Sequence, residues 1–136
     1  MTSTLAAGPT TFAEAIDVIE ETYEFMLAYA AQGRRREEDD AGAGIRERLA
    51  RAEAALAIIA SATADQIGAA AAQGAAGDFV DIVRQDAARA GAAFRFVLSQ
   101  PSIGSQIVDN LNATTHVRTL LTDLFLLDET LKISGI

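Results

Sequence analysis

The sequence predicts an all-α protein, an antiparallel four-helix bundle whose last helix is broken. Apolar residues recur at alternating spacings of four and three in four separate segments, which is the pattern of helices that bury one face. The chain has 136 residues, of which 50% are apolar, so it can form one domain with a substantial core. We therefore expect a flexible leader over residues 1–10 and a single helical domain over residues 11–136.

The first helix is predicted over residues 11–32 and has the clearest pattern in the chain. Thr11 and Glu14 form a T-x-x-E capping box, in which each side chain satisfies a free amide at the start of the helix. Gly33 marks the end, because glycine is favoured just after a helix. The apolar stripe is wide enough to contact two neighbouring helices. It consists of Phe12, Ile16, Ile19, Tyr23, Met26 and Ala30.

The second helix is predicted over residues 44–63, antiparallel to the first. Between the two helices, residues 34–40 hold three arginines followed by four acidic residues, which we interpret as a solvated loop or a charged helix start. Residues 64–77 are the least specified segment, because glycines interrupt a run of alanines. We expect a frayed extension of the second helix and then a loop. The alternative is a close helix contact through Gly68 and Ala72.

The third helix is predicted over residues 78–99, with Asp78 as its cap. It ends before Pro101, because the residue preceding a proline avoids the helical conformation. Its apolar stripe contains Phe79, Val83, Ala90, Phe94 and Val97, with Ile82, Ala93 and Phe96 beside it.

Asp86 falls in the middle of this stripe, and a carboxylate among apolar side chains needs a partner or a raised pKa. Arg89, one turn later on the same helix, is the nearest candidate partner. Candidates on other helices are Tyr23, Arg48 and Arg118. Three interpretations remain open: an ion pair with Arg89 at the edge of the stripe, a buried polar contact that fixes helix register, and a ligand-binding or catalytic carboxylate.

The fourth helix is predicted over residues 106–132. Its apolar face rotates by about 150° after Leu111, at 3.6 residues per turn. A kink, or a new cap at Asn112 or Thr114, would explain this rotation. Large apolar side chains also lie off the main stripe near residue 125, so we expect this part of the helix to supply an interface. The predicted interface residues are Phe125, Leu126 and Leu127.

Composition excludes several chemistries and partners. The absence of cysteine excludes thiol catalysis, disulfides and cysteine-ligated metals. The formal net charge of −8 disfavours nucleic acids and anionic membrane surfaces, because both attract basic proteins. No segment reaches the roughly 18 apolar residues of a membrane span, and the N-terminus lacks the pattern of a signal peptide. We therefore expect a cytoplasmic protein that binds no metal and no cofactor.

No catalytic signature is present in the sequence. His116 is the only histidine, and one histidine cannot complete a four-ligand metal site. The sequence contains neither a G-x-S-x-G element nor a phosphate-binding loop. As a phosphoacceptor, His116 would be expected to have a lysine nearby, whereas the only lysine is Lys132. The sequence therefore favours a non-catalytic protein.

Two functions from different classes remain. The first is a protein–protein interaction module, a homodimer that associates through its last helix or binds another protein. The second is a small-molecule site inside the bundle, with apolar walls and a few polar contacts. Its walls would be Tyr23, Met26 and Tyr29, and its polar contacts would come from Asp86, Arg89 and Arg118.

Overall fold

The computed structural model describes residues 8–39, 44–68 and 73–131. These residues form six α-helices and one short 3-10 helix, and none of them lies in a strand, so the all-α prediction is confirmed. Most of the predicted leader, residues 1–7, lies outside the described residues. The elements are α2 (Phe12–Ala31), η1 (Glu37–Asp39), α3 (Ile45–Ala60), α4 (Ala64–Ile67), α5 (Gly74–Leu98), α6 (Ser105–Ala113) and α7 (Thr115–Leu131).

The helix α2 begins and ends as its sequence predicts. Thr11 Oγ1 accepts a hydrogen bond from the amide of Glu14 at 3.1 Å, and Glu14 Oε1 accepts one from the amide of Thr11 at 3.2 Å, which completes the capping box. After the helix, Gly33 has a φ of +66°, a conformation that favours glycine. Phe12, Ile16 and the other large apolar residues of the stripe are buried, except Tyr23, which is half-buried.

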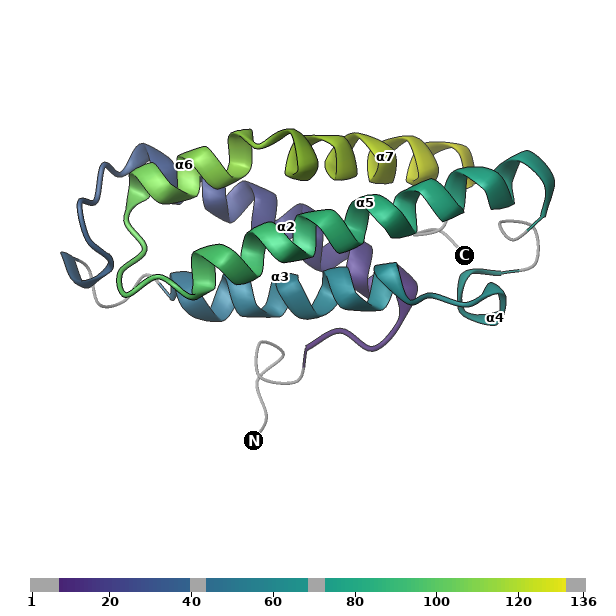
Figure 1. Cartoon of the computed structure of the whole chain (residues 1–136), viewed down its shortest axis with the longest axis horizontal. Coiled ribbons are helices and arrows are strands. Elements are labelled where there is room, and N and C mark those ends of the chain that lie inside the picture. The colour runs from purple at the N-terminus through teal and green to yellow at the C-terminus, as the bar shows by residue number, and fades with distance from the viewer. Residues whose placement is uncertain (1–7, 40–43, 69–72, 132–136) are drawn as a thin grey trace.

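The long helices pack in an order that closes around one core. The helix α3 lies between α2 and α5, α7 packs on α5, and α6 packs on α2. Figure 1 shows α6 and α7 following one another along one side of the molecule, with α5 running beside α7 in the opposite direction. Each helix buries the stripe that its sequence predicts. Fully buried examples are Ile16 on α2, Leu49 and Ile59 on α3, Val83 on α5 and Leu124 on α7.

The predicted break in the last helical segment is present at Thr114. Its backbone is extended, with φ −61° and ψ 144°, and its Oγ1 accepts a hydrogen bond from the amide of Val117 at 3.2 Å. The side chain therefore caps α7. The break accounts for the rotation of the apolar face, because α6 packs mainly on α2 whereas α7 packs mainly on α5.

Two boundary predictions are wrong. The helix α5 begins at Gly74, so Asp78 lies inside it and is not its cap. Alanines before Asp78 favour helix strongly enough to extend it backwards. Residues 61–67 do not extend α3, which ends at Ala60; they form a turn and the separate short helix α4. Ala72, half of the alternative helix contact, lies outside the described residues.

The edge of the α5 stripe is also more exposed than predicted. Ile82 is 48% exposed and Phe96 is 70% exposed, although both lie beside the buried stripe. The helix lies between α3 and α7, and neither neighbour reaches these two side chains far enough to cover them. These two positions are therefore surface positions.

Polar contacts join the two loops at one end of the molecule. Tyr29 Oη donates a hydrogen bond to the carbonyl of Ile103 at 2.6 Å, and Ser105 Oγ donates one to the carbonyl of Tyr29 at 2.7 Å. The guanidinium of Arg46 donates to the carbonyl of Leu98 at 2.9 Å and pairs with Glu37 at 2.9 Å. The charged loop between α2 and α3 is thus partly fixed against the loop that follows α5.

A pair of glycine substitutions tests this packing. A Cβ added at Gly104 would lie 2.6 Å from the carbonyl oxygen of Arg35, and neither backbone can move independently. Gly104→Ala should lower the free energy of unfolding by about 1–3 kcal/mol. At Gly91 the nearest atom, 3.3 Å away, belongs to the flexible end of Arg95.

Gly91→Ala is the matched control, because alanine favours a helix over glycine by about 1 kcal/mol. It should leave stability unchanged or raise it. Urea unfolding followed by circular dichroism measures both variants, and equal effects at the two sites would contradict the packing described here.

Candidate functional site

Asp86 and Asp123 form a carboxyl pair between α5 and α7. Asp86 is only 8% exposed, and its Oδ1 lies 3.1 Å from the guanidinium of Arg89, which confirms the predicted local partner. Arg89 itself has a mostly exposed side chain. The second partner was not predicted: the side chain of Asp123 on α7 makes a hydrogen bond with that of Asp86. Such a bond between two carboxyl groups requires that one of them carries a proton.

The proton belongs mainly to Asp123. Burial raises the pKa of Asp123 to about 7, and the hydrogen bond to Asp86 and the charge of Asp86 act in the same direction. Asp123 Oδ2 is shielded from solvent and has no hydrogen-bond partner among the described residues. Protonation therefore avoids a bare charge next to the Asp86 carboxylate. Asp123 can therefore hold or release a proton near neutral pH.

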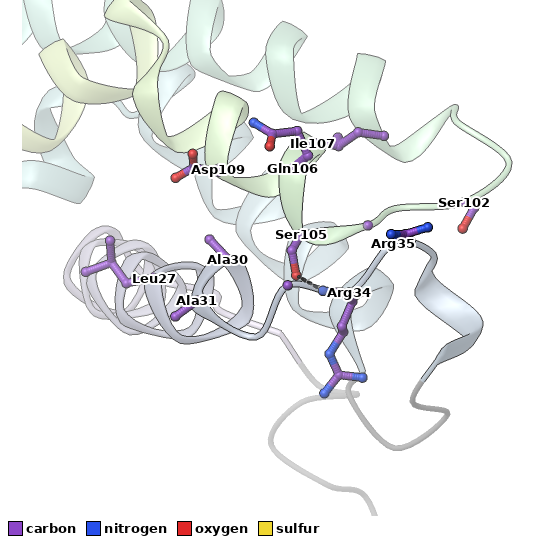
Figure 2. Close-up of a pocket in the computed structure, with 12 residues that line it drawn as sticks. Leu27, Ala30, Ala31, Arg34, Arg35, Ser102, Ser105, Gln106, Ile107 and Asp109 are labelled. Atoms are coloured by element: carbon purple, nitrogen blue, oxygen red, sulfur yellow. Dashed lines mark hydrogen bonds between the residues drawn. The ribbon is translucent and has the colours of Figure 1, made fainter.

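One cleft, which we call the end cleft, lies between the C-terminal end of α2 and the start of α6. It has a volume of about 660 Å³. Figure 2 shows the side chain of Arg34 directed away from α6, while its amide donates a hydrogen bond to Ser105 Oγ at 2.8 Å. The guanidinium of Arg34 lies over the ring of Tyr29, 5.1 Å from its centre. The hydroxyl of Ser105 and the guanidinium of Arg34 are thus engaged within the protein. The polar groups that line the end cleft mainly hold the two loops together.

A second cleft, which we call the bend cleft, lies beside the break at Thr114. It has a volume of about 370 Å³ and is lined by Tyr23 of α2 and by residues of α6 and α7, among them Asp109, Asn112, Arg118, Leu121 and Phe125. Behind it, Tyr23, Asn112 and Leu121 also line a small apolar cavity that reaches the core. The bend cleft therefore joins a polar mouth to an apolar floor.

Asn112 lines this cleft and has a buried polar atom without a partner. Its Oδ1 is shielded from solvent and has no hydrogen-bond partner among residues 8–39, 44–68 and 73–131. A buried acceptor without a partner costs about 1–3 kcal/mol. Such a group in a cleft indicates either a tolerated defect or a binding contact.

The structure separates the residues predicted for a small-molecule site. Tyr23 and Arg118 both line the bend cleft, and Met26 is buried behind it beside the small apolar cavity. Tyr29 is buried at the end of the molecule, where its hydroxyl bonds to a backbone carbonyl. Asp86 and Arg89 lie on the α5–α7 side. The predicted set is therefore not a single site.

The predicted interface residues also differ in position. Phe125 is 48% exposed and lines the bend cleft, and Leu126 is 52% exposed. Leu127 is buried, with 1% exposure, because it continues the apolar stripe of α7. An interface that used Leu127 would require the helices to separate, so this residue is a core residue.

The acidic side of α2 meets the C-terminal part of α7. Burial raises the pKa of Glu20, and the charge of Asp128 on α7 raises it further. Burial and then the charge of Glu21 raise the pKa of Asp17. Within the described part of the chain, no three or more histidine, aspartate and glutamate side chains are placed to hold a metal ion. These carboxylates therefore repel one another across the α2–α7 contact.

No protein-family model, curated protein or solved structure matches this chain. None of the described helices is both long enough and apolar enough to cross a membrane.

The carboxyl pair predicts a pH dependence of stability. The pKa of Asp123 is about 7 in the folded protein and about 3.9 when unfolded. The folded state binds the proton more tightly, so stability falls as the pH rises from about 4 to about 7 and then levels off. Because Asp123 is partly exposed, solvent screens part of this effect. We expect the free energy of unfolding to fall by on the order of 1–2 kcal/mol over this range.

Asp123→Asn should flatten this decline and raise stability at pH 8, because an amide can donate to the Asp86 carboxylate without a second charge. Urea unfolding between pH 4 and pH 8 measures the difference from the wild type. Asp78→Asn, at an exposed acid on α5, is the control and should follow the wild-type curve. If the stability of Asp123→Asn changed with pH in the same way as that of the wild type, Asp123 would not be the group that takes up the proton.

Proposed function

We propose that the protein is a non-catalytic interaction module that binds a second copy of itself through the face formed by α5 and α7. One observation carries this proposal. Five large apolar side chains of the described residues are close to half exposed or more, and only Leu27 among them lies outside these two neighbouring helices. The other four are Ile82, Phe96, Phe125 and Leu126.

Three of these four side chains belong to one surface. Ile82 and Phe96 are separated by two heptads, so they lie on the same side of α5. Asp86 of α5 lies opposite Asp123 of α7, and the positions of other residues along the two helices can be counted from this contact. Leu126 is three residues beyond Asp123. Because the helices are antiparallel, it lies level with the turn of α5 before Asp86, and that turn contains Ile82. We call the surface around Ile82, Phe96 and Leu126 the α5–α7 face.

Charge permits a second copy as the occupant of this face. The chain carries a formal charge of −8, so two copies repel unless they meet where acidic residues are sparse. The acidic arc lies on α2, at Glu14, Asp17, Glu21 and Glu24. Exposed positions on α7 include the uncharged Thr115, Thr119, Thr122 and Thr130, and Glu129 is the exposed acid among the described positions of that helix. A twofold contact through the α5–α7 face keeps the acidic arcs apart.

Phe125 has a different place in this proposal. Successive residues of a helix are turned by about 100°, so Phe125 and Leu126 face different neighbours. Phe125 lines the bend cleft on the α2 side, whereas Leu126 belongs to the α5–α7 face. We therefore centre the interface on Leu126 and the exposed residues of α5.

Sedimentation velocity at micromolar concentration tests this proposal. The wild type should sediment as a dimer, and Phe96→Glu and Leu126→Glu should each yield the monomer, because each places a charge in the apolar contact. Both positions are exposed in the single chain, so helical content should stay unchanged.

Leu27→Glu is the matched control, since Leu27 is 47% exposed but lies on α2. It should remain dimeric. A wild type that is monomeric at 100 µM, or a Leu27→Glu variant that dissociates as readily as the other two, would count against the α5–α7 face.

A further inference from the structure

The bend cleft lies apart from the α5–α7 face and has its own unused polar groups. The amide oxygen of Asn112, a residue that lines the cleft, is shielded from solvent and finds no donor among the described residues. Buried acceptors in folded proteins almost always have a donor. A molecule that enters this cleft and offers an N–H or O–H group would satisfy it.

Two opposite charges also line the cleft without neutralising each other. Arg118 of α7 and Asp109 of α6 both line it. Within the described ranges, neither side chain forms an ion pair, although each lies in the same small space. A cation and an anion that line one cleft without pairing are complementary to a ligand that carries both charges.

The remaining wall is apolar and partly aromatic. Phe125 is about half exposed at the cleft, and the ring of Tyr23 and the side chain of Leu121 continue the surface inward. The small cavity behind them is lined almost wholly by core residues, including Met26 and Val117. The cleft volume of about 370 Å³ is in the lower part of the range of about 300–1,000 Å³ that is usual for ligand sites.

We propose that the bend cleft binds a free α-amino acid with a large apolar side chain. The carboxylate of the ligand pairs with Arg118. Its ammonium group donates to Asp109 and to the amide oxygen of Asn112. Its side chain packs on Phe125, Leu121 and the ring of Tyr23. Each of the unused groups then has a partner, and the apolar part of the ligand covers the exposed face of Phe125.

Isothermal titration calorimetry on the full chain at pH 7 tests the ligand class. The probes are L-phenylalanine, 3-phenylpropionate, which lacks the ammonium group, and 2-phenylethylamine, which lacks the carboxylate. L-Phenylalanine should bind at least tenfold more tightly than either analogue. Absence of binding at millimolar L-phenylalanine overturns the proposal, as does equally tight binding of 3-phenylpropionate.

Substitutions test the site. Arg118→Gln and Asn112→Leu should each weaken L-phenylalanine binding at least tenfold. Asn112→Leu should leave the thermal midpoint unchanged or raise it, because it removes a buried acceptor without a partner, so lost binding will not reflect unfolding. Arg89→Gln, at an exposed arginine on α5, is the control and should bind as the wild type does. Wild-type affinity in Arg118→Gln overturns the assignment.

The Leu126→Glu variant separates this proposal from self-association. The bend cleft does not include Leu126, so this variant should bind L-phenylalanine with unchanged affinity whether or not it dimerises. A loss of binding in Leu126→Glu would show that the site depends on the α5–α7 face, which contradicts a site formed within one chain.

Discussion

The break of the last helical segment at Thr114 is the constraint on which the rest of the structure depends. The apolar residues before Thr114 and those after it lie on different faces of the helical segment. One straight helix could not pack both sets against the same neighbour. The extended backbone of Thr114 and its hydrogen bond to the amide of Val117 end one helix and start the next within a single residue. As a result α6 packs on α2 and α7 packs on α5, and together they complete the core.

Both candidate functional features follow from this division. Because α7 packs on α5, Asp123 meets Asp86, and burial together with the neighbouring Asp86 raises the pKa of Asp123 to about 7. Because α7 correspondingly makes few contacts with α2, space remains beside Tyr23, and the bend cleft occupies it. One local departure from helical geometry therefore produces a proton-binding pair on one side of α7 and a cleft on the other.

Local signals in the sequence predict those parts of the fold that depend on local interactions. Thr11, Glu14 and Gly33 set the limits of α2, and Asp86 is recognised as anomalous from its own stripe. Asp123 is not, because its partner depends on the register of α5 against α7, which no local pattern encodes. The prediction for Ile82 and Phe96 is wrong for a related reason. An apolar stripe shows which side of a helix is buried, but it does not show how far the neighbouring helices cover the edges of that side. The position of Arg46, which caps the end of α5, likewise depends on tertiary packing.

Disulfide cross-linking tests most directly whether the break turns α7 onto α5 in this register. The chain contains no cysteine, so introduced pairs react without competition. The pair Asp86→Cys and Asp123→Cys should cross-link rapidly under mild oxidation. His116 lies seven residues earlier on α7, about 10 Å along the helix axis, and disulfides require Cα atoms within about 7 Å. Asp86→Cys with His116→Cys should therefore remain reduced; faster cross-linking of that pair than of the 86–123 pair would contradict the account.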